Sequence, residues 1–260
     1  MISSLDGLRD WLRTAGWRAT ITWAAYKTQL AIGLRIPELL RITPGQALFP
    51  LQARTGASSD IDVLWQVFRA EEYGCVRALS RPLFIIDLGA NVGYSSIFFL
   101  SEFPESTVLA VEPDPGNFKL CTANLKPYGK RALLLCGAAW SRRCSLSLAR
   151  GEGDGRDWAV QVREGDDSGQ ATVEAFDIPS LLSIANANEI DLLKVDIEKS
   201  EIELFGPSCA DWLPRVKNIC IELHGPDCDE VFFHALQGYD YKLSHSGELT
   251  FCQNLRPKVG

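Results

Sequence analysis

The stretch Phe84-Ile-Ile-Asp-Leu-Gly-Ala-Asn-Val-Gly-Tyr94, followed by Val108-Leu-Ala-Val-Glu-Pro-Asp114, decides the fold of this 260-residue chain. Its order is an apolar run, a glycine-rich turn, a helix, and a second apolar run that ends in a carboxylate. An apolar run without polar alternation is typical of a strand that is covered on both faces, as in a parallel sheet. The stretch therefore predicts an α/β unit with a ligand pocket beside the turn.

The pocket expected at this turn fits a nucleoside. Gly89 and Gly93 bracket the turn, and glycine permits positive φ angles and a close approach of a ligand to the backbone. The second strand, 107–111, ends at Glu112. A carboxylate at this position accepts hydrogen bonds from both hydroxyls of a ribose, and it repels a phosphorylated ribose.

Asn91 separates two alternatives for the ligand. The dinucleotide fingerprint is Gly-x-Gly-x-x-Gly with an acidic residue about 20 residues further on. Here the pattern is Asp87-x-Gly89-x-Asn91-x-Gly93, with Asn91 where a second glycine would bring the backbone against a pyrophosphate. A sulfonium amino acid needs hydrogen-bonding side chains at that point instead. We therefore expect S-adenosylmethionine rather than NAD or FAD.

Several motifs in sequence order resemble those of the FkbM-type methyltransferase family. They are the two stretches already quoted, Arg54-Thr-Gly-Ala-Ser-Ser-Asp60, Cys136-Gly-Ala-Ala-Trp140, Leu192-Leu-Lys-Val-Asp-Ile-Glu198 and Ile221-Glu-Leu-His224. The resemblance covers roughly residues 46 to 255. It implies a class I methyltransferase fold and transfer of a methyl group, usually to oxygen, on natural products or sugar-containing molecules.

One residue departs from the family's pattern. The family usually has glycine after the motif Ile-Asp-x-Glu, and this chain has Lys199. Glycine allows a backbone angle that lysine adopts only at a cost. We therefore expect this loop to be reshaped, and we expect the Lys199 ammonium to meet an acidic acceptor.

Ligands of such sheets bind at the carboxyl ends of the strands, and the motifs all lie there. Ala138 and Ala139 follow the third strand, and their small side chains leave room for an adenine ring. The residues expected to bind the methyl donor are Asp87, Gly89, Ala90, Asn91, Gly93, Tyr94, Glu112, Pro113, Asn117, Ala138, Ala139 and Asp196.

Asp196 and His224 are the two candidates for a general base that accepts the proton of an alcohol acceptor. Each also has a structural alternative, as a hydrogen-bonding group at a strand end. The residues expected to contact the acceptor are Arg54, Ser59, Trp158, Lys199 and Glu222. The glycine-rich stretch 151–169 is either a substrate lid or a solvated hairpin. We expect no metal ion, with Asp196, Glu222 and His224 as the group that could meet around one.

Composition and length indicate one α/β domain, 46–260, preceded by a helical segment, 1–45. Residues 1–54 hold seven basic and three acidic side chains. The helical segment carries Trp23, Tyr26 and Leu30 on one helical face. It is expected to pack on the domain or on a second subunit in a homodimer. Contact with an anionic membrane surface is the alternative. The net charge of −7 argues against nucleic-acid binding.

The chain lacks an apolar run long enough for a membrane span and a secretory signal at its start. Eight scattered cysteines fit free buried thiols in a reducing cytoplasm. Helices are expected near 5–15, 20–35, 60–73, 94–103, 115–126, 177–186, 199–206 and 228–237. Strands are expected at 83–88, 107–111, 131–136, 144–149, 158–163, 171–175, 190–195, 216–223, 239–244 and 248–253, the last two as an antiparallel hairpin.

The sequence therefore predicts a cytoplasmic, S-adenosylmethionine-dependent methyltransferase with a mostly parallel sheet and helices on both faces. The expected reaction is O-methylation of a hydroxyl on a small natural product or saccharide. N-methylation of a small molecule and a non-catalytic S-adenosylmethionine-binding protein remain alternatives.

Overall fold

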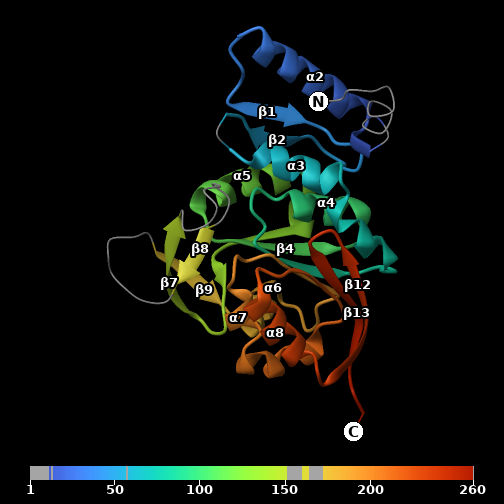
Figure 1. Cartoon of the computed structure of the whole chain (residues 1–260), viewed down its shortest axis with the longest axis vertical. Helices are drawn as coiled ribbons and strands as arrows, with labels where there is room; N and C mark the ends of the chain where they lie inside the picture. Colours follow the sequence, from blue (N-terminus) through green and yellow to red (C-terminus); the bar gives the residue numbers. More distant parts are fainter. Residues whose placement is uncertain (1–11, 13, 57, 151–159, 164–171, 260) are drawn as a thin grey trace.

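The computed structural model describes residue 12 and residues 14–56, 58–150, 160–163 and 172–259. Its centre is a seven-stranded sheet with the order β12-β13-β11-β10-β3-β4-β5 (Figure 1). Strands β11, β10, β3, β4 and β5 run parallel, while β13 runs antiparallel to β11 and β12 antiparallel to β13. The sequence predicted this parallel sheet and its C-terminal antiparallel hairpin.

The elements have the following bounds. The strands are β1 (Leu39–Ile42), β2 (Leu51–Arg54), β3 (Phe84–Leu88), β4 (Thr107–Glu112), β5 (Ala132–Cys136), β6 (Ala138–Ala139), β7 (Cys144–Arg150), β8 (Val160–Arg163), β9 (Thr172–Phe176), β10 (Leu192–Val195), β11 (Ile219–Glu222), β12 (Tyr239–Ser246) and β13 (Leu249–Pro257). The α-helices are α2 (Trp17–Ala31), α3 (Asp60–Phe68), α4 (Tyr94–Glu102), α5 (Pro115–Leu125), α6 (Ile178–Ala185), α7 (Glu201–Leu204) and α8 (Pro226–Ala235). The 3-10 helices are η1 (Glu72–Ala78), η2 (Lys126–Arg131), η3 (Pro207–Asp211) and η4 (Leu213–Arg215).

Both faces of the sheet are buried, which explains the apolar runs. Successive strand residues point to opposite faces, so Ile85 joins the core beneath α3, α4 and α5 while Ile86 joins the core beneath α6, α7 and α8. Val108 and Leu109 on the neighbouring strand divide in the same way. The two cores hold the strands in register, so that their carboxyl ends meet at one edge.

The N-terminal segment packs on the face that carries α3. Trp23 of α2 meets Trp65 of α3 edge to face, with ring centroids 5.2 Å apart, and Tyr26 is buried. Leu30, expected on the same face, is 48% exposed. Strands β1 and β2 form a separate antiparallel pair that spans residue 45, the expected boundary between the segment and the domain. That boundary stays a prediction.

A second, smaller sheet lies beside the main one, with the order β6-β9-β7-β8. Its four strands include the three short strands expected around the acidic stretch. The expected lid, 151–169, falls outside the described residues except for 160–163.

The sequence prediction was wrong in three local details. The pair β1 and β2 was missed, because each strand has only four residues. The helix expected over 60–73 ends at Phe68, and Glu71 with a φ of 54° separates it from η1. The helix expected over 199–206 has only the residues of α7, because Glu198 and Lys199 have left-handed backbone angles.

In the described part of the chain, no helix combines the length and the apolar character needed to cross a bilayer. All eight cysteines lie within this part and are free thiols; most are buried, and Cys136 is exposed.

Candidate functional site

The glycine turn after β3 is fixed by close approach to β10. Gly89 has a φ of 72°, and a Cβ atom there would lie 1.8 Å from the backbone oxygen of Asp196. Its N–H donates a hydrogen bond of 3.0 Å to the carbonyl of Val111 near the end of β4. The turn therefore touches the ends of both neighbouring strands, which only a residue without a side chain permits.

Glu112, at the end of β4, is 4% exposed and lies against this turn. Its carboxylate accepts hydrogen bonds from the backbone N–H of Asn91 (2.8 Å) and of Asp114 (3.0 Å). Burial raises the pKa of Glu112 to about 7, although these two donors and Asn117 work in the opposite direction. A carboxylate has about four acceptor positions, so Glu112 retains capacity for the hydroxyls of a ligand.

Lys194 is a fully buried cation in the middle of β10, and the sequence analysis did not select it. Its Nζ lies 3.1 Å from Oδ1 of Asp87 and donates to the carbonyls of Gly89 (2.8 Å) and Leu88 (3.2 Å). Burial lowers the pKa of Lys194, but the charges of Asp87 and Asp196 outweigh burial and raise it. The ammonium group thus ties the glycine turn to β10.

Asp87 itself is 0% exposed and does not line the cavity. Its Oδ2 accepts hydrogen bonds from the hydroxyls of Ser95 (2.6 Å) and Ser96 (2.5 Å) in the first turn of α4. The residue expected to bind the donor directly is therefore placed behind the turn, where it holds Lys194 and the start of α4.

His224 lies among four carboxylates. Its Nδ1 is 3.0 Å from Glu201, and its Nε2 is 3.7 Å from Asp196, 3.8 Å from Glu198 and 3.7 Å from Glu222. Burial lowers the pKa of His224, but the hydrogen bond and charge of Glu201, with Asp196 and Glu198, raise it to about 9. Burial and the charge of Asp196 raise the pKa of Glu222 to about 7.

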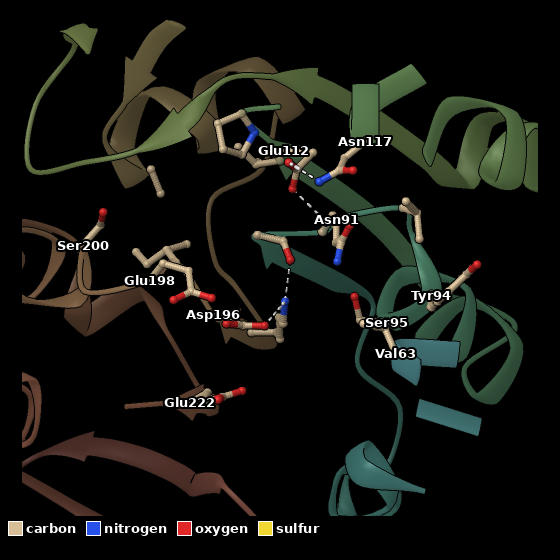
Figure 2. A pocket seen from close by; sticks show the side chains of 18 of the residues that line it. Val63, Asn91, Tyr94, Ser95, Glu112, Asn117, Asp196, Glu198, Ser200 and Glu222 are labelled. Carbon is tan, nitrogen blue, oxygen red and sulfur yellow. Dashed lines mark hydrogen bonds and ion pairs between the residues drawn. The ribbon is translucent and has the colours of Figure 1, made fainter. Parts of the chain in front are cut away.

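A cavity of about 230 Å³ lies at the carboxyl ends of the strands, and several of the charged side chains described above line it. Figure 2 shows Asn91, Glu112 and Asn117 on one side of it and Asp196, Glu198 and Glu222 on another. Glu72 and Glu248 add two more carboxylates to the wall, and Lys194 is the one lysine or arginine among the described lining residues. The cavity therefore favours a ligand with positive charge.

Most of the residues selected from sequence meet in this cavity. They are Gly89, Ala90, Asn91, Tyr94, Glu112, Pro113, Asn117, Ala138, Ala139, Asp196 and Glu222. Gly93, His224, Arg54, Ser59 and Lys199 do not line it, and Trp158 lies outside the described residues.

The residues off the cavity have other contacts. Gly93 has a φ of 90° at the N-terminus of α4. The guanidinium of Arg54 donates to the buried carboxylate of Asp60 (2.7 Å) and to Oδ1 of Asn117 (2.7 Å), so it reaches the cavity only through Asn117. Ser59 precedes α3 without a side-chain cap.

The loop at Lys199 keeps a conformation that glycine would favour. Lys199 is exposed and has a φ of 73°, in the left-handed region. Lys199 therefore carries a backbone cost that glycine would not, and the reshaping of the loop stays a prediction.

Sequence reasoning missed four kinds of lining residue. Lys194 had a signal, since a lone lysine inside the apolar run Leu192-Leu-Lys-Val195 must find a buried anion. Glu198 was identified only as the last residue of the motif Leu192-Leu-Lys-Val-Asp-Ile-Glu198 and was given no role in the site. Glu72 and Glu248 come from a 3-10 turn and from the β12–β13 turn, where no motif marks them. The α3 residues Val63, Gln66 and Val67 close one side.

Comparison with known proteins gives the family. Residues 87–243 match the model of the methyltransferase FkbM domain. The chain is 30% identical over 175 residues to 31-O-demethyl-FK506 methyltransferase FkbM of Streptomyces tacrolimicus, a match that covers 55% of this chain and 66% of that protein. It is 21% identical over 194 residues to Methyltransferase 1 of Beauveria bassiana, covering 67% and 78%.

Solved structures with a similar arrangement are methyltransferases. A precorrin-6y C5,15-methyltransferase from Geobacter metallireducens has 14% identity and a TM-score of 0.45, over 80% of this chain and 94% of that one. An O-methyltransferase from Bacillus cereus, solved in complex with SAH, has 12% identity and a TM-score of 0.43, over 72% and 79%. The sheet order and the hairpin confirm the α/β fold with a mostly parallel sheet that the sequence predicted.

Proposed function

The chain belongs to the FkbM methyltransferase family, and we propose that it transfers a methyl group from S-adenosylmethionine to a hydroxyl oxygen of a small natural product or saccharide. The observation that carries the proposal is the buried Glu112 carboxylate, which faces the same cavity as Asp196 across the glycine turn. A ribose at Glu112 and a charged amino-acid end at Asp196 match the two halves of this methyl donor.

The chemistry of the wall supports this orientation of the donor. The small side chains of Ala138 and Ala139 leave room for an adenine ring beside Glu112. The sulfonium and the ammonium of the donor are cations, and the carboxylates at the other end attract them. Asp196 has its backbone oxygen against Gly89, so a ligand that follows the turn passes directly beside it.

The same wall disfavours a nicotinamide dinucleotide. A pyrophosphate carries negative charge and would enter a cavity lined by six carboxylates, Glu72, Glu112, Asp196, Glu198, Glu222 and Glu248. The backbone N–H of Asn91 donates a hydrogen bond to Glu112. In a dinucleotide-binding fold this N–H would point at the pyrophosphate. Both features oppose the binding of a dinucleotide.

Methyl transfer from a sulfonium is an in-line displacement, so the protein mainly aligns the nucleophile, the methyl group and the sulfur. An alcohol acceptor also gives up its proton, and a carboxylate within hydrogen-bond reach accepts it. We assign this role to Asp196, which lines the cavity; His224, the other candidate, lies behind it and positions it. The Streptomyces relative is a 31-O-demethyl-FK506 methyltransferase, and this name supports oxygen as the acceptor atom.

The test is methyl transfer from deuterium-labelled S-adenosylmethionine to a panel of hydroxyl- and amine-bearing acceptors, with mass spectrometry of the products. The proposal expects a gain of one labelled methyl group on oxygen, reduced at least 100-fold in Asp196→Asn. Labelled products only on nitrogen would favour the N-methyltransferase alternative. Binding of S-adenosylhomocysteine with no turnover on any acceptor would favour the non-catalytic alternative.

A further inference from the structure

We propose that Asp196, Glu198, Glu222 and His224 form a binding site for one divalent transition-metal ion, such as Mn²⁺, at the acceptor end of the cavity. The sequence alone led us to expect no metal, because no pair of His, Asp or Glu residues has a spacing that demands one; Asp196, Glu222 and His224 were the group that could meet around an ion. The structure adds Glu198 to the group and Glu201 behind it, and the ligand atoms of Asp196, Glu198 and His224 all lie within 4.8 Å of one another.

His224 is oriented as a metal-binding histidine is. Glu201 is 0% exposed, and one of its oxygens accepts both the N–H of Ile197 (3.1 Å) and the Nδ1–H of His224 (3.0 Å). Because Nδ1 donates to a carboxylate, Nε2 is the nitrogen left to face the other acids. Metal-bound histidines almost always have such a carboxylate or carbonyl partner on the second nitrogen, and it fixes the ring.

The spacing of the ligand atoms fits an ion. Ligands about 2.1 Å from a metal lie roughly 3.0 Å apart at neighbouring octahedral positions and about 3.4 Å apart in a tetrahedron. The distances from Nε2 to the three carboxylates are 3.7, 3.8 and 3.7 Å. A contraction of a few tenths of an ångström brings each carboxylate oxygen to ligand spacing from Nε2, and the ligand atoms of Asp196, Glu198 and His224 already lie within 4.8 Å of one another.

The donor set indicates the class of metal. Imidazole suits transition metals such as Zn²⁺ and Fe²⁺, whereas carboxylates also suit Mn²⁺, Mg²⁺ and Ca²⁺. One imidazole with three carboxylates therefore favours Mn²⁺ or a related first-row ion over Ca²⁺, which takes oxygen ligands only. The cluster carries a large negative charge, which a divalent ion offsets.

The ion would be accessible to the acceptor, because Asp196, Glu198 and Glu222 all line the cavity (Figure 2). This step rests on the proposed function: a hydroxyl bound to a divalent ion would lose its proton more readily, to the carboxylate oxygen of Asp196 that the ion leaves free, and the resulting alkoxide would attack the methyl group. An acceptor with two neighbouring oxygens, such as a vicinal diol, would chelate the ion and be selected over a single alcohol.

The experiment measures metal binding directly, without turnover. Tag-free protein is treated with EDTA, dialysed and titrated with Mn²⁺, and free Mn²⁺ is followed by electron paramagnetic resonance. The proposal expects one ion per chain, and at least a tenfold loss of affinity in each of Glu198→Gln, His224→Gln and Glu201→Gln. Glu203→Gln, which removes the same charge from an exposed position on the same helix, should keep the affinity.

Histidine NMR provides a second readout in the unmodified chain. The sequence has three histidines, His224, His234 and His245. Substoichiometric Mn²⁺ should broaden the ring signals of His224 and leave those of His234 sharp. Absence of saturable Mn²⁺ binding, or binding that the three variants leave unchanged, would overturn the proposal. Titration of the EDTA-treated protein with S-adenosylhomocysteine separates this failure from failure of the proposed function, because the ribose site at Glu112 lies outside the proposed metal ligands and donor binding does not require the ion.

Discussion

Replacing Lys194 with methionine removes the one positive charge that the described residues place against Asp87. Methionine has nearly the same length and fills the same space, so the change isolates the charge and its hydrogen bonds. The variant loses the 3.1 Å ion pair with Asp87 and the hydrogen bond to the carbonyl of Gly89. It leaves a fully buried carboxylate with only two serine hydroxyls as donors.

The expected cost follows from this geometry. Breaking a buried ion pair by removal of one partner costs about 3–5 kcal/mol, because the other charge remains without compensation. For a protein of this size about 1 kcal/mol lowers Tm by roughly 2–4 °C. We therefore expect Lys194→Met to lower Tm by roughly 6–20 °C. Lys242→Met, at an exposed position on β12, should stay within about 0.5 kcal/mol of wild type.

A double-mutant cycle with Asp87→Asn tests the cause. Denaturant unfolding of the wild type, both single variants and the double variant gives the coupling energy between Lys194 and Asp87. We expect at least about 2 kcal/mol, because the double variant no longer buries an uncompensated charge. The reasoning is refuted if Lys194→Met costs less than about 1 kcal/mol, or if the two changes add to within about 0.5 kcal/mol.

Two further predictions concern the donor site, and a third concerns the loop at Lys199. Gly89→Ala would place a Cβ 1.8 Å from the backbone oxygen of Asp196, so calorimetry should show S-adenosylhomocysteine affinity reduced more than 100-fold; Gly129→Ala, which also has a positive φ but no atom within 4 Å, should bind normally. The pKa of about 7 at Glu112 lies above its ordinary value of 4.5, so the stability it contributes to the free protein is lost as pH rises from 4.5 to 7. Ribose hydroxyls prefer the ionised carboxylate, so donor binding releases a proton from Glu112, and the affinity for S-adenosylhomocysteine should rise about tenfold from pH 6 to 8. Glu112→Gln should abolish this pH dependence. An affinity that does not change with pH in the wild type would contradict the role of Glu112. Lys199→Gly should raise the free energy of unfolding by about 1 kcal/mol in denaturant titrations, because glycine adopts the observed φ of 73° without strain; an unchanged or lower stability would show that the loop carries no such cost.

Much of the fold followed from the sequence because both faces of the sheet are covered. Apolar runs such as 84–88 and 107–112 are typical of strands that are buried on both faces. The glycine turn between them marks the edge of the sheet where a ligand binds. The short strands β1 and β2 could not be predicted in the same way, since four residues carry too little periodicity. Their packing depends on contacts with α2, α3 and α5, and α5 is distant in sequence.

The site was predictable where a motif lies at a strand end, as for Asn91, Glu112 and Asp196. It was not predictable where side chains from several elements converge. Spacing gives no sign that Glu72 and Glu248 share one cavity, because they come from a 3-10 helix and a hairpin turn. Asp87 is the opposite case. Its motif is clear and predicted contact with the methyl donor, but its side chain lies behind the glycine turn and points toward Lys194.

The central claim is that the cavity between Glu112 and Asp196 binds S-adenosylmethionine as the methyl donor. Isothermal titration calorimetry of the wild-type chain with S-adenosylhomocysteine, and separately with NAD, tests it most directly. The account predicts one S-adenosylhomocysteine per chain with a dissociation constant in the micromolar range or below, and no heat with NAD. Saturable binding of NAD together with no binding of S-adenosylhomocysteine would contradict it.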